Sequence, residues 1–257
     1  MRAVSVHHDA IVVTSLLWQT TATAIRAGGE TMLVDSPYFP DELALLPAVL
    51  GQSGFEPTAL LATHGDFDHV LGRLAFPELA LGVPDTTALR LREGPGEAQR
   101  ALRDEDAKHY VRRPRPLSLG QVQSLPVPGK LEVGGQELEL HPAEGHTADG
   151  VALLAPWIGL LVCGDYLSDV EIPVVSPGGS VAGYRSSLAR LAGLAEHAET
   201  VVPGHGSVHD RDAALRLLDE DSAYLDALDR GEERPRLPAG RDDSRQRAIH
   251  AANLARV

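Results

Sequence analysis

The sequence predicts an α/β fold (α+β in chain order), a four-layer αβ/βα sandwich with two mixed β-sheets packed face to face and helices outside. Strand-like segments are followed by helical segments, and this order occurs twice along the chain. The 257 residues, 43% of them hydrophobic, can also bury a sizeable core. We therefore expect a single domain over residues 1–257.

The first half begins with β-forming segments between turn signals such as Gly28-Gly29. Four strands are expected, over residues 10–14, 20–25, 31–34 and 60–63. A helix should follow Pro40 from Asp41 to Leu50, although Pro47 argues against its second half. Residues 70–76 should form a further helix.

Residues 84–120 are expected to be an insertion over the fold that forms a lid on the site. A strand at 79–83 precedes Asp85, a predicted N-cap for a helix reaching Glu93, and a second helix should cover 97–109. Long insertions near sites carried by loops often shape specificity. A solvated connector is the alternative.

The second half repeats the order of strands and then helices. Strands are expected over residues 121–126, 129–133, 136–141, 151–154, 158–163 and 200–202, and helices over 181–197, 210–228 and 244–257. Gly134-Gly135 should form a hairpin turn between two of these strands. Residues 229–257 are expected to form a C-terminal helical tail.

The charge balance argues against two classes of partner. The chain has 23 Lys and Arg against 36 Asp and Glu, a formal net charge of −13, which repels a phosphate backbone and offers no basic surface for anionic lipid. The longest apolar run, residues 151–163, contains Pro156 and is shorter than the roughly 20 residues needed to span a bilayer. We expect a small-molecule substrate, without nucleic-acid or membrane partners.

The chain is expected to be cytoplasmic. His7, His8 and Asp9 precede any apolar run, unlike a secretory leader, and the single cysteine, Cys163, cannot form an internal disulfide. Cys163 lies in an apolar run and should be a small buried side chain. Assembly into a homo-oligomer remains open.

Four short polar segments follow strand-like segments, and each contains a glycine that lets the backbone approach an ion. They are Thr63–His69, with His64, Asp66, Asp68 and His69; Gly145-His146-Thr147; Gly164-Asp165; and Pro203-Gly204-His205-Gly206. Imidazole and carboxylate are ligands of Zn²⁺, Fe²⁺ and Mn²⁺, and the lack of thiolates argues against a structural zinc ribbon. Alone, the first segment would also suit a polar helix start.

In combination, these segments resemble the metallo-β-lactamase superfamily, whose signature THxHxDH is followed by GHT, GD and PGHG. The resemblance covers about residues 1–210. It implies a dinuclear centre of two divalent ions, with zinc expected first and Fe or Mn as alternatives. It assigns His64, Asp66 and His146 to one ion, Asp68, His69 and His205 to the other, and Asp165 as the bridge.

The sequence departs from this signature at Asp66, where most members have histidine. Two divalent ions with Asp66, Asp68, Asp165 and a hydroxide would carry no net formal charge, whereas the common pattern would carry one positive charge. We expect the extra carboxylate to weaken Lewis acidity and to favour oxygen-preferring ions such as Fe or Mn.

The resemblance implies a metal-dependent hydrolase that cleaves an ester, thioester or lactone bond through a metal-bound hydroxide, as in glyoxalase II-like and lactonase-like members. Asp68 is the expected catalytic residue, which would orient the hydroxide and pass a proton to the leaving group. An iron oxidoreductase of the persulfide-dioxygenase kind is one alternative. A binding-only member, in which Asp66 has spoiled the first site, is another.

Three residues near the expected site are candidates for substrate contact: Tyr166, Tyr184 and Arg185. Tyr166 directly follows the expected bridging residue, and Arg185 could hold a carboxylate or phosphate. Asp149 should either support a ligating imidazole or cap a turn at Gly150. The remaining histidines are expected to be ordinary surface or packing residues, with His209 the least certain.

Overall fold

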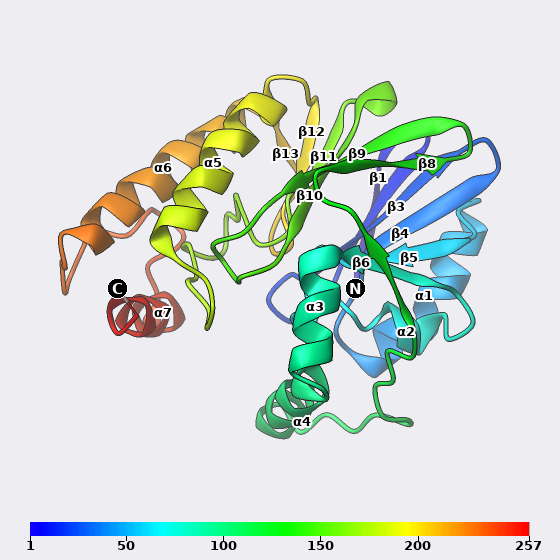
Figure 1. The fold of residues 1–257 in the computed structure, drawn as a ribbon, viewed down its shortest axis with the longest axis horizontal. Coiled ribbons are helices and arrows are strands. Elements are labelled where there is room, and N and C mark those ends of the chain that lie inside the picture. Colours follow the sequence, from blue (N-terminus) through cyan, green and yellow to red (C-terminus); the bar gives the residue numbers. More distant parts are fainter. Residues whose placement is uncertain (257) are drawn as a thin grey trace.

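The computed structural model describes residues 1–256 and has the predicted four layers (Figure 1). Two β-sheets pack against each other. Helices α1–α4 cover the outer face of the first sheet, and α5–α7 lie on the opposite side of the molecule. The predicted fold class is therefore confirmed.

The first sheet has seven strands in sequential order from β1 to β7. Its strands are β1 (Arg2–His7), β2 (Ala10–Thr14), β3 (Thr21–Ala27), β4 (Glu30–Asp35), β5 (Ala59–Leu61), β6 (Leu81–Pro84) and β7 (Val122–Leu125). The associated helices are α1 (Pro40–Gln52), α2 (Gly72–Ala75), α3 (Asp85–Glu93) and α4 (Glu97–Lys108). Strands β1 to β4 pair antiparallel, while β4 to β7 pair parallel, so the sheet is mixed.

The second sheet has six strands in the order β13-β12-β11-β10-β9-β8. Its strands are β8 (Gly129–Val133), β9 (Gln136–Pro142), β10 (Val151–Ala155), β11 (Leu160–Val162), β12 (Thr200–Val202) and β13 (His209–Asp210). A short 3₁₀ turn, Pro156–Ile158, joins β10 to β11, and the helices are α5 (Val181–Ala195), α6 (Arg211–Asp229) and α7 (Ser244–Leu254). Only the β11–β12 pair is parallel among these strands of the described chain.

Alternating side chains of the buried strands supply three apolar layers. Val34 and Leu153 face the layer between the two sheets. Leu33 packs toward α1–α4, and Leu154 packs toward α5 and α6. Because both faces of the central strands are covered, these strands are almost continuously apolar in sequence.

Several predicted boundaries differ from the structure. Helix α1 continues through Pro47 to Gln52, and Pro47 lies on the exposed face of the helix. Asp85 is the first residue of α3 and Pro84 occupies the cap position, so the predicted N-cap was wrong. Strands β1 and β13 were not predicted.

Residues 85–121 form the crossover between two neighbouring parallel strands, β6 and β7. Helices α3 and α4 of this crossover lie at the lower edge of Figure 1, and their residues Ala88 and Leu102 belong to the same apolar layer as Leu33. Residues 85–121 therefore connect two strands of the first sheet. Their role as a lid stays a prediction.

Among residues 1–256, no helix combines the length and apolar character that crossing a membrane requires.

Candidate metal centre

The four polar segments lie in loops that directly follow strands of both sheets. Strand β5 leads into the loop that carries His64, Asp66, Asp68 and His69. The loop between β9 and β10 carries His146, and the residues after β11 and β12 carry Asp165 and His205. Because β11 and β12 run parallel, their carboxyl ends meet at one edge, which brings Asp165 next to His205.

These loops bring all seven predicted ligands together. Ligand atoms of His64, Asp66 and His146 lie within 4.8 Å of one another, as do those of Asp68, His69 and His205. A third such group joins His64, His69 and Asp165. The grouping matches the two sets that the resemblance assigned, with Asp165 between them.

Asp165 lies at the centre of the four imidazoles. Its Oδ2 atom lies 3.7 Å from Nε2 of His64, 3.3 Å from Nε2 of His146 and 3.4 Å from Nε2 of His205. Its Oδ1 atom lies 3.1 Å from Nε2 of His69. A single carboxylate therefore faces every histidine of the cluster.

Several of these atoms are buried without a hydrogen-bond partner among the described residues. They are Nε2 of His64, His69 and His146, and Oδ1 of Asp165. Buried polar atoms are seldom left unpaired, so a group of them aimed at one another needs an explanation. Bound cations would supply it, since imidazole nitrogens and carboxylates are ligands of divalent metals.

The charges of the cluster also favour a bound cation. Burial lowers the pKa values of His146 and His205, but the negative charge of Asp165 together with other acidic neighbours outweighs burial and raises both to about 9. Burial raises the pKa of Asp165, yet the surrounding imidazoles hold it well below its ordinary value. The cluster therefore takes up positive charge, and metal ions would compete with protons for the same atoms.

Each histidine has a polar group close to its other ring nitrogen, by a hydrogen bond or, for His69, at ion-pair distance. Nδ1 of His146 donates to the carbonyl of Val174 over 2.8 Å, and Nδ1 of His69 lies 3.0 Å from Oδ2 of Asp35. The hydroxyls of Thr63 and Thr20 lie 3.1 Å and 3.3 Å from Nδ1 of His64 and His205, respectively. These partners orient each ring so that Nε2 faces the centre.

None of these partners was predicted from the sequence. Asp35 ends β4 beside β5, so the rule that located the ligands, a polar residue after a strand, could have indicated it. Thr20 and Val174 stand in loops without a motif, and only the folded chain brings them to the site.

Asp68, the predicted catalytic residue, is buried beside the second set of ligands. Its Oδ2 atom lies 3.4 Å from Nε2 of His205. Burial raises its pKa, the positive charges of His69 and His205 lower it, and the net pKa lies above the ordinary value. Ser36 anchors the backbone here, because its hydroxyl donates to the Asp68 carbonyl.

Asp149 has a different role from the two predicted for it. Its Oδ2 atom accepts from the backbone N–H of Gly65 over 2.8 Å and from the Thr87 hydroxyl over 2.6 Å. Its Oδ1 atom accepts from Arg90 over 2.9 Å. Asp149 therefore ties the first ligand loop to helix α3.

The three predicted substrate contacts have other partners. The buried Tyr166 hydroxyl accepts from the backbone N–H of His146 and donates to a carbonyl, and the buried Tyr184 hydroxyl donates to the Asp165 carbonyl. Arg185 lies 2.8 Å from both Asp226 and Asp229 on α6. The two tyrosines thus brace the ligand loops and Arg185 joins α5 to α6, while a contact of these side chains with substrate stays a prediction.

His209 and Cys163 fit the simpler interpretations. His209 is buried with Nε2 4.0 Å from Oδ1 of Asp169, and it belongs to none of the ligand groups. Cys163 is buried in the layer under α5, and burial raises the pKa of its thiol.

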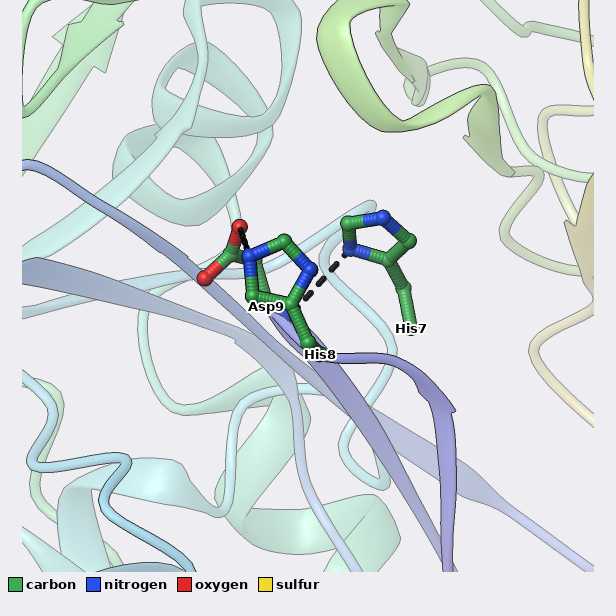
Figure 2. Close-up of side chains that lie close together, drawn as sticks. All are labelled: His7, His8 and Asp9. Atoms are coloured by element: carbon green, nitrogen blue, oxygen red, sulfur yellow. Dashed lines mark hydrogen bonds and ion pairs between the residues drawn. The ribbon is translucent and has the colours of Figure 1, made fainter.

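A separate histidine pair lies at the turn between β1 and β2 (Figure 2). Nε2 of His8 lies 2.7 Å from Oδ2 of Asp9, and Nδ1 of His7 accepts from the Asp9 backbone N–H. Arg26 donates to the same carboxylate. Because Asp9 is already paired with a permanent cation and His8 is mostly exposed, these contacts explain the turn without an ion.

An apolar strip borders the second set of ligands. It consists of Trp18, in the loop between β2 and β3, and Phe67, with the exposed Leu16 in the same loop as Trp18, and Cζ of Arg245 lies 5.3 Å from the centre of the Trp18 ring. The Trp18 ring lies 6.4 Å from the His205 ring and 6.2 Å from the Phe67 ring, and Leu16 is 76% exposed. The loop is joined to the His205 segment by the hydrogen bond from Gly206 N–H to the Gln19 carbonyl.

Comparison with known proteins agrees with this architecture. A family model described as the metallo-beta-lactamase superfamily matches residues 16–205, which include all seven clustered side chains. The chain therefore belongs to the metallo-β-lactamase superfamily.

Individual relatives and solved structures can be compared with the chain in the same way. The chain is 30% identical over 215 residues to "Acyl-coenzyme A thioesterase MBLAC2" of Gallus gallus, covering 75% of this chain and 74% of that protein. A metallo-beta-lactamase family protein of Thermus thermophilus matches with a TM-score of 0.67 and 19% identity, over 88% of this chain and 83% of the other. A metallo-beta-lactamase from Pontibacter korlensis matches with a TM-score of 0.63 and 18% identity, over 85% and 98%. At these identities the solved structures support the fold alone.

Proposed function

We propose that the protein is a dinuclear metal-dependent hydrolase that cleaves an acyl thioester, with esters and lactones as related substrates. Membership in the superfamily and the thioesterase relative support a hydrolase. The bond that is cleaved and the occupation of two metal positions are our inferences. Zinc is the first candidate for both ions, with Fe or Mn as alternatives.

The observation that carries the proposal is the convergence of unpaired ligand atoms on Asp165. Three Nε2 atoms and one carboxylate oxygen are buried, unpaired within residues 1–256 and mutually oriented. The Nδ1 partners preset the rings, which reduces the reorganisation that ion binding requires. Divalent ions held there would supply Lewis acidity and an activated water.

The surrounding residues support a substrate with an apolar part. The strip of Leu16, Trp18 and Phe67 offers aromatic and aliphatic surface next to His205. An acyl chain placed on this strip would bring its carbonyl carbon toward the ligand cluster. The thioesterase activity in the relative's name agrees with such a substrate.

Asp68 is the proposed proton carrier. Its carboxylate faces His205 and lies on the same loop as three other ligands, so it can hold a proton close to the reacting atoms. A carboxyl group at this position could donate a proton to a departing thiolate or alkoxide.

The two alternative functions, an iron oxidoreductase and a binding-only protein, can be distinguished by metal content and turnover. An iron oxidoreductase would retain Fe and consume O₂ with a thiol substrate. A binding-only member would retain less than one ion per chain and show no turnover. The contact of Arg90 with Asp66 favours a working site over a spoiled one, because a partner for the additional carboxylate is built into α3.

The test is metal quantification on protein purified without added metal, followed by assays with acyl thioesters, lactones, phosphodiesters and β-lactams. We expect close to two ions per chain and the highest kcat/KM with a thioester. Asp165→Ala should remove most of the activity and at least one ion while the circular dichroism spectrum stays unchanged. Full turnover in that variant would exclude Asp165 as the bridge.

The acidic net charge and the single buried cysteine support a cytoplasmic enzyme with a small-molecule substrate as part of this proposal. Residues 85–121 could cover the substrate, since Arg90 already reaches the cluster from α3.

A further inference from the structure

The guanidinium of Arg90 lies between two carboxylates at the edge of the candidate metal centre. Its Nη2 atom lies 2.8 Å from Oδ1 of Asp66, and its Nη1 atom lies 2.9 Å from Oδ1 of Asp149. The other oxygen of Asp66, Oδ2, lies 3.8 Å from Nε2 of His64 and 3.5 Å from Nε2 of His146. The two oxygens of Asp66 therefore face different partners.

The position of Arg90 is fixed from several sides. Asp149, which holds one end of the guanidinium, is itself bonded to Gly65 and Thr87. Nη2 of Arg90 also lies 3.3 Å from Oε1 of Glu97 at the start of α4. Three carboxylates around one cation leave little positive charge to attract an anionic substrate, so the contacts of Arg90 point to a role toward Asp66.

We propose that Arg90 and Asp66 act as one unit in which Arg90 withholds Oδ1 and offsets the carboxylate charge. Asp66 then presents a single, weakly charged oxygen at the position where most members of the superfamily have a neutral imidazole. Because Arg90 also pairs with Asp149 and Glu97, it offsets the charge of Asp66 only in part. This inference rests on the proposed function, because it requires metal ions at the cluster.

The consequence is a control on metal preference. Without Arg90, both oxygens of Asp66 would be free and the carboxylate would carry its full charge. Oxygen-rich, negatively charged sites favour Mn²⁺ relative to sites rich in imidazole, which suit Zn²⁺. Arg90 is therefore a positioning residue that keeps the site selective for zinc despite the additional carboxylate.

The test compares metal selectivity, which does not depend on turnover. Metal-free protein is equilibrated with a limiting, equimolar mixture of Zn²⁺ and Mn²⁺, separated from free ions, and analysed by mass spectrometry for both metals. Arg90→Met should raise the bound Mn:Zn ratio about threefold to fivefold, the range that a partly exposed ion pair can supply. Arg92→Met, an exposed change on the same helix, should leave the ratio unchanged.

Two further variants separate this role from general disturbance. Arg90→Lys keeps the charge but not both hydrogen bonds, so its ratio should lie between those of the wild type and Arg90→Met. In an Asp66→His background, which we expect to bind Zn²⁺ at least as well as the wild type, Arg90→Met should not shift the ratio.

An unchanged ratio in Arg90→Met, or an equal shift in the Asp66→His background, would overturn the pairing of Arg90 with Asp66. In either case bound ions in the wild type would leave the proposed function intact. A wild-type protein that retains neither metal would instead overturn the proposed function and this inference together.

Discussion

The Oδ2 atom of Asp35 lies 3.0 Å from Nδ1 of His69 and also accepts the hydroxyl proton of Thr63. The other oxygen of Asp35 accepts from the backbone N–H of Thr63. One buried carboxylate at the end of β4 thus orients a predicted ligand and anchors the start of the loop that carries three more. Such a partner fixes the ring and increases the basicity of its other nitrogen.

Asp35→Asn should weaken metal binding while the fold is retained. Asp35 has a φ of +59°, a conformation that asparagine tolerates well, and the amide oxygen can still accept from Thr63 N–H. Asparagine removes the negative charge beside Nδ1 of His69, so we expect metal affinity to fall about 10- to 100-fold. Chelator competition measures this affinity, with exposed Asp104→Asn on α4 as the control. Equal affinities in the two variants would contradict the role of Asp35.

Gly204→Ala should block the centre directly. A Cβ atom on Gly204 would lie 2.2 Å from Oδ1 of Asp165 and 3.0 Å from Cε1 of His69. Because such contacts force ligand side chains to move, we expect loss of most bound metal and activity. Gly193→Ala on α5 is the matched control, since its Cβ would meet nothing within 4 Å and helix propensity favours alanine by about 1 kcal/mol. Full metal content in Gly204→Ala would show that the ligand atoms do not converge as described.

The ligands could be predicted from the sequence and most of their partners could not, and this difference has a physical origin. His146, Asp165 and His205 could be predicted because each stands beside a glycine after an apolar strand, a local pattern. Thr20, Val174 and Arg90 lie in separate parts of the chain, and their proximity to the ligands depends on strand register and on the path of the crossover. A sequence pattern of local period carries no information about such distant pairs.

The fold, like the site, was predictable only where a local sequence pattern reveals it. The central strands were predictable because both of their faces are buried, whereas β1 is an edge strand whose residues are mostly exposed. Helix α1 was predicted too short because an exposed proline costs less than the sequence pattern indicates. The bracing contacts of Tyr166 and Tyr184 were not predictable from the sequence, because their hydroxyls bond to backbone groups of loops that are distant along the chain.

The metal-free protein should lose stability as the pH rises from about 6.5 to 9. Folding raises the pKa values of His146 and His205 to about 9, so proton binding stabilises the folded state below the unfolded value and this contribution disappears as the pH rises through 9. His64 has a lowered pKa, which affects stability only below about 6.5. Thermal unfolding of chelator-treated protein at pH 6.5 and 9 measures the effect.

Zinc-loaded protein is the control for this pH dependence. Ions that replace the protons on the imidazoles should remove most of the difference in unfolding temperature between the two pH values. A metal-free protein with equal unfolding temperatures at pH 6.5 and 9 would contradict the charge distribution of the cluster.

Asn253→Ala should destabilise the protein and loosen one ligand. The buried Asn253 side chain on α7 accepts from Val175 N–H and donates to the Pro173 carbonyl, on either side of Val174, whose carbonyl accepts from His146. Leaving these buried backbone groups unpaired should cost about 2 kcal/mol in the free energy of unfolding, measured in urea. Since the His146 ring then loses its fixed acceptor, metal affinity should also fall by about tenfold. A loss of stability without any loss of affinity would show that α7 supports the fold but not the position of His146.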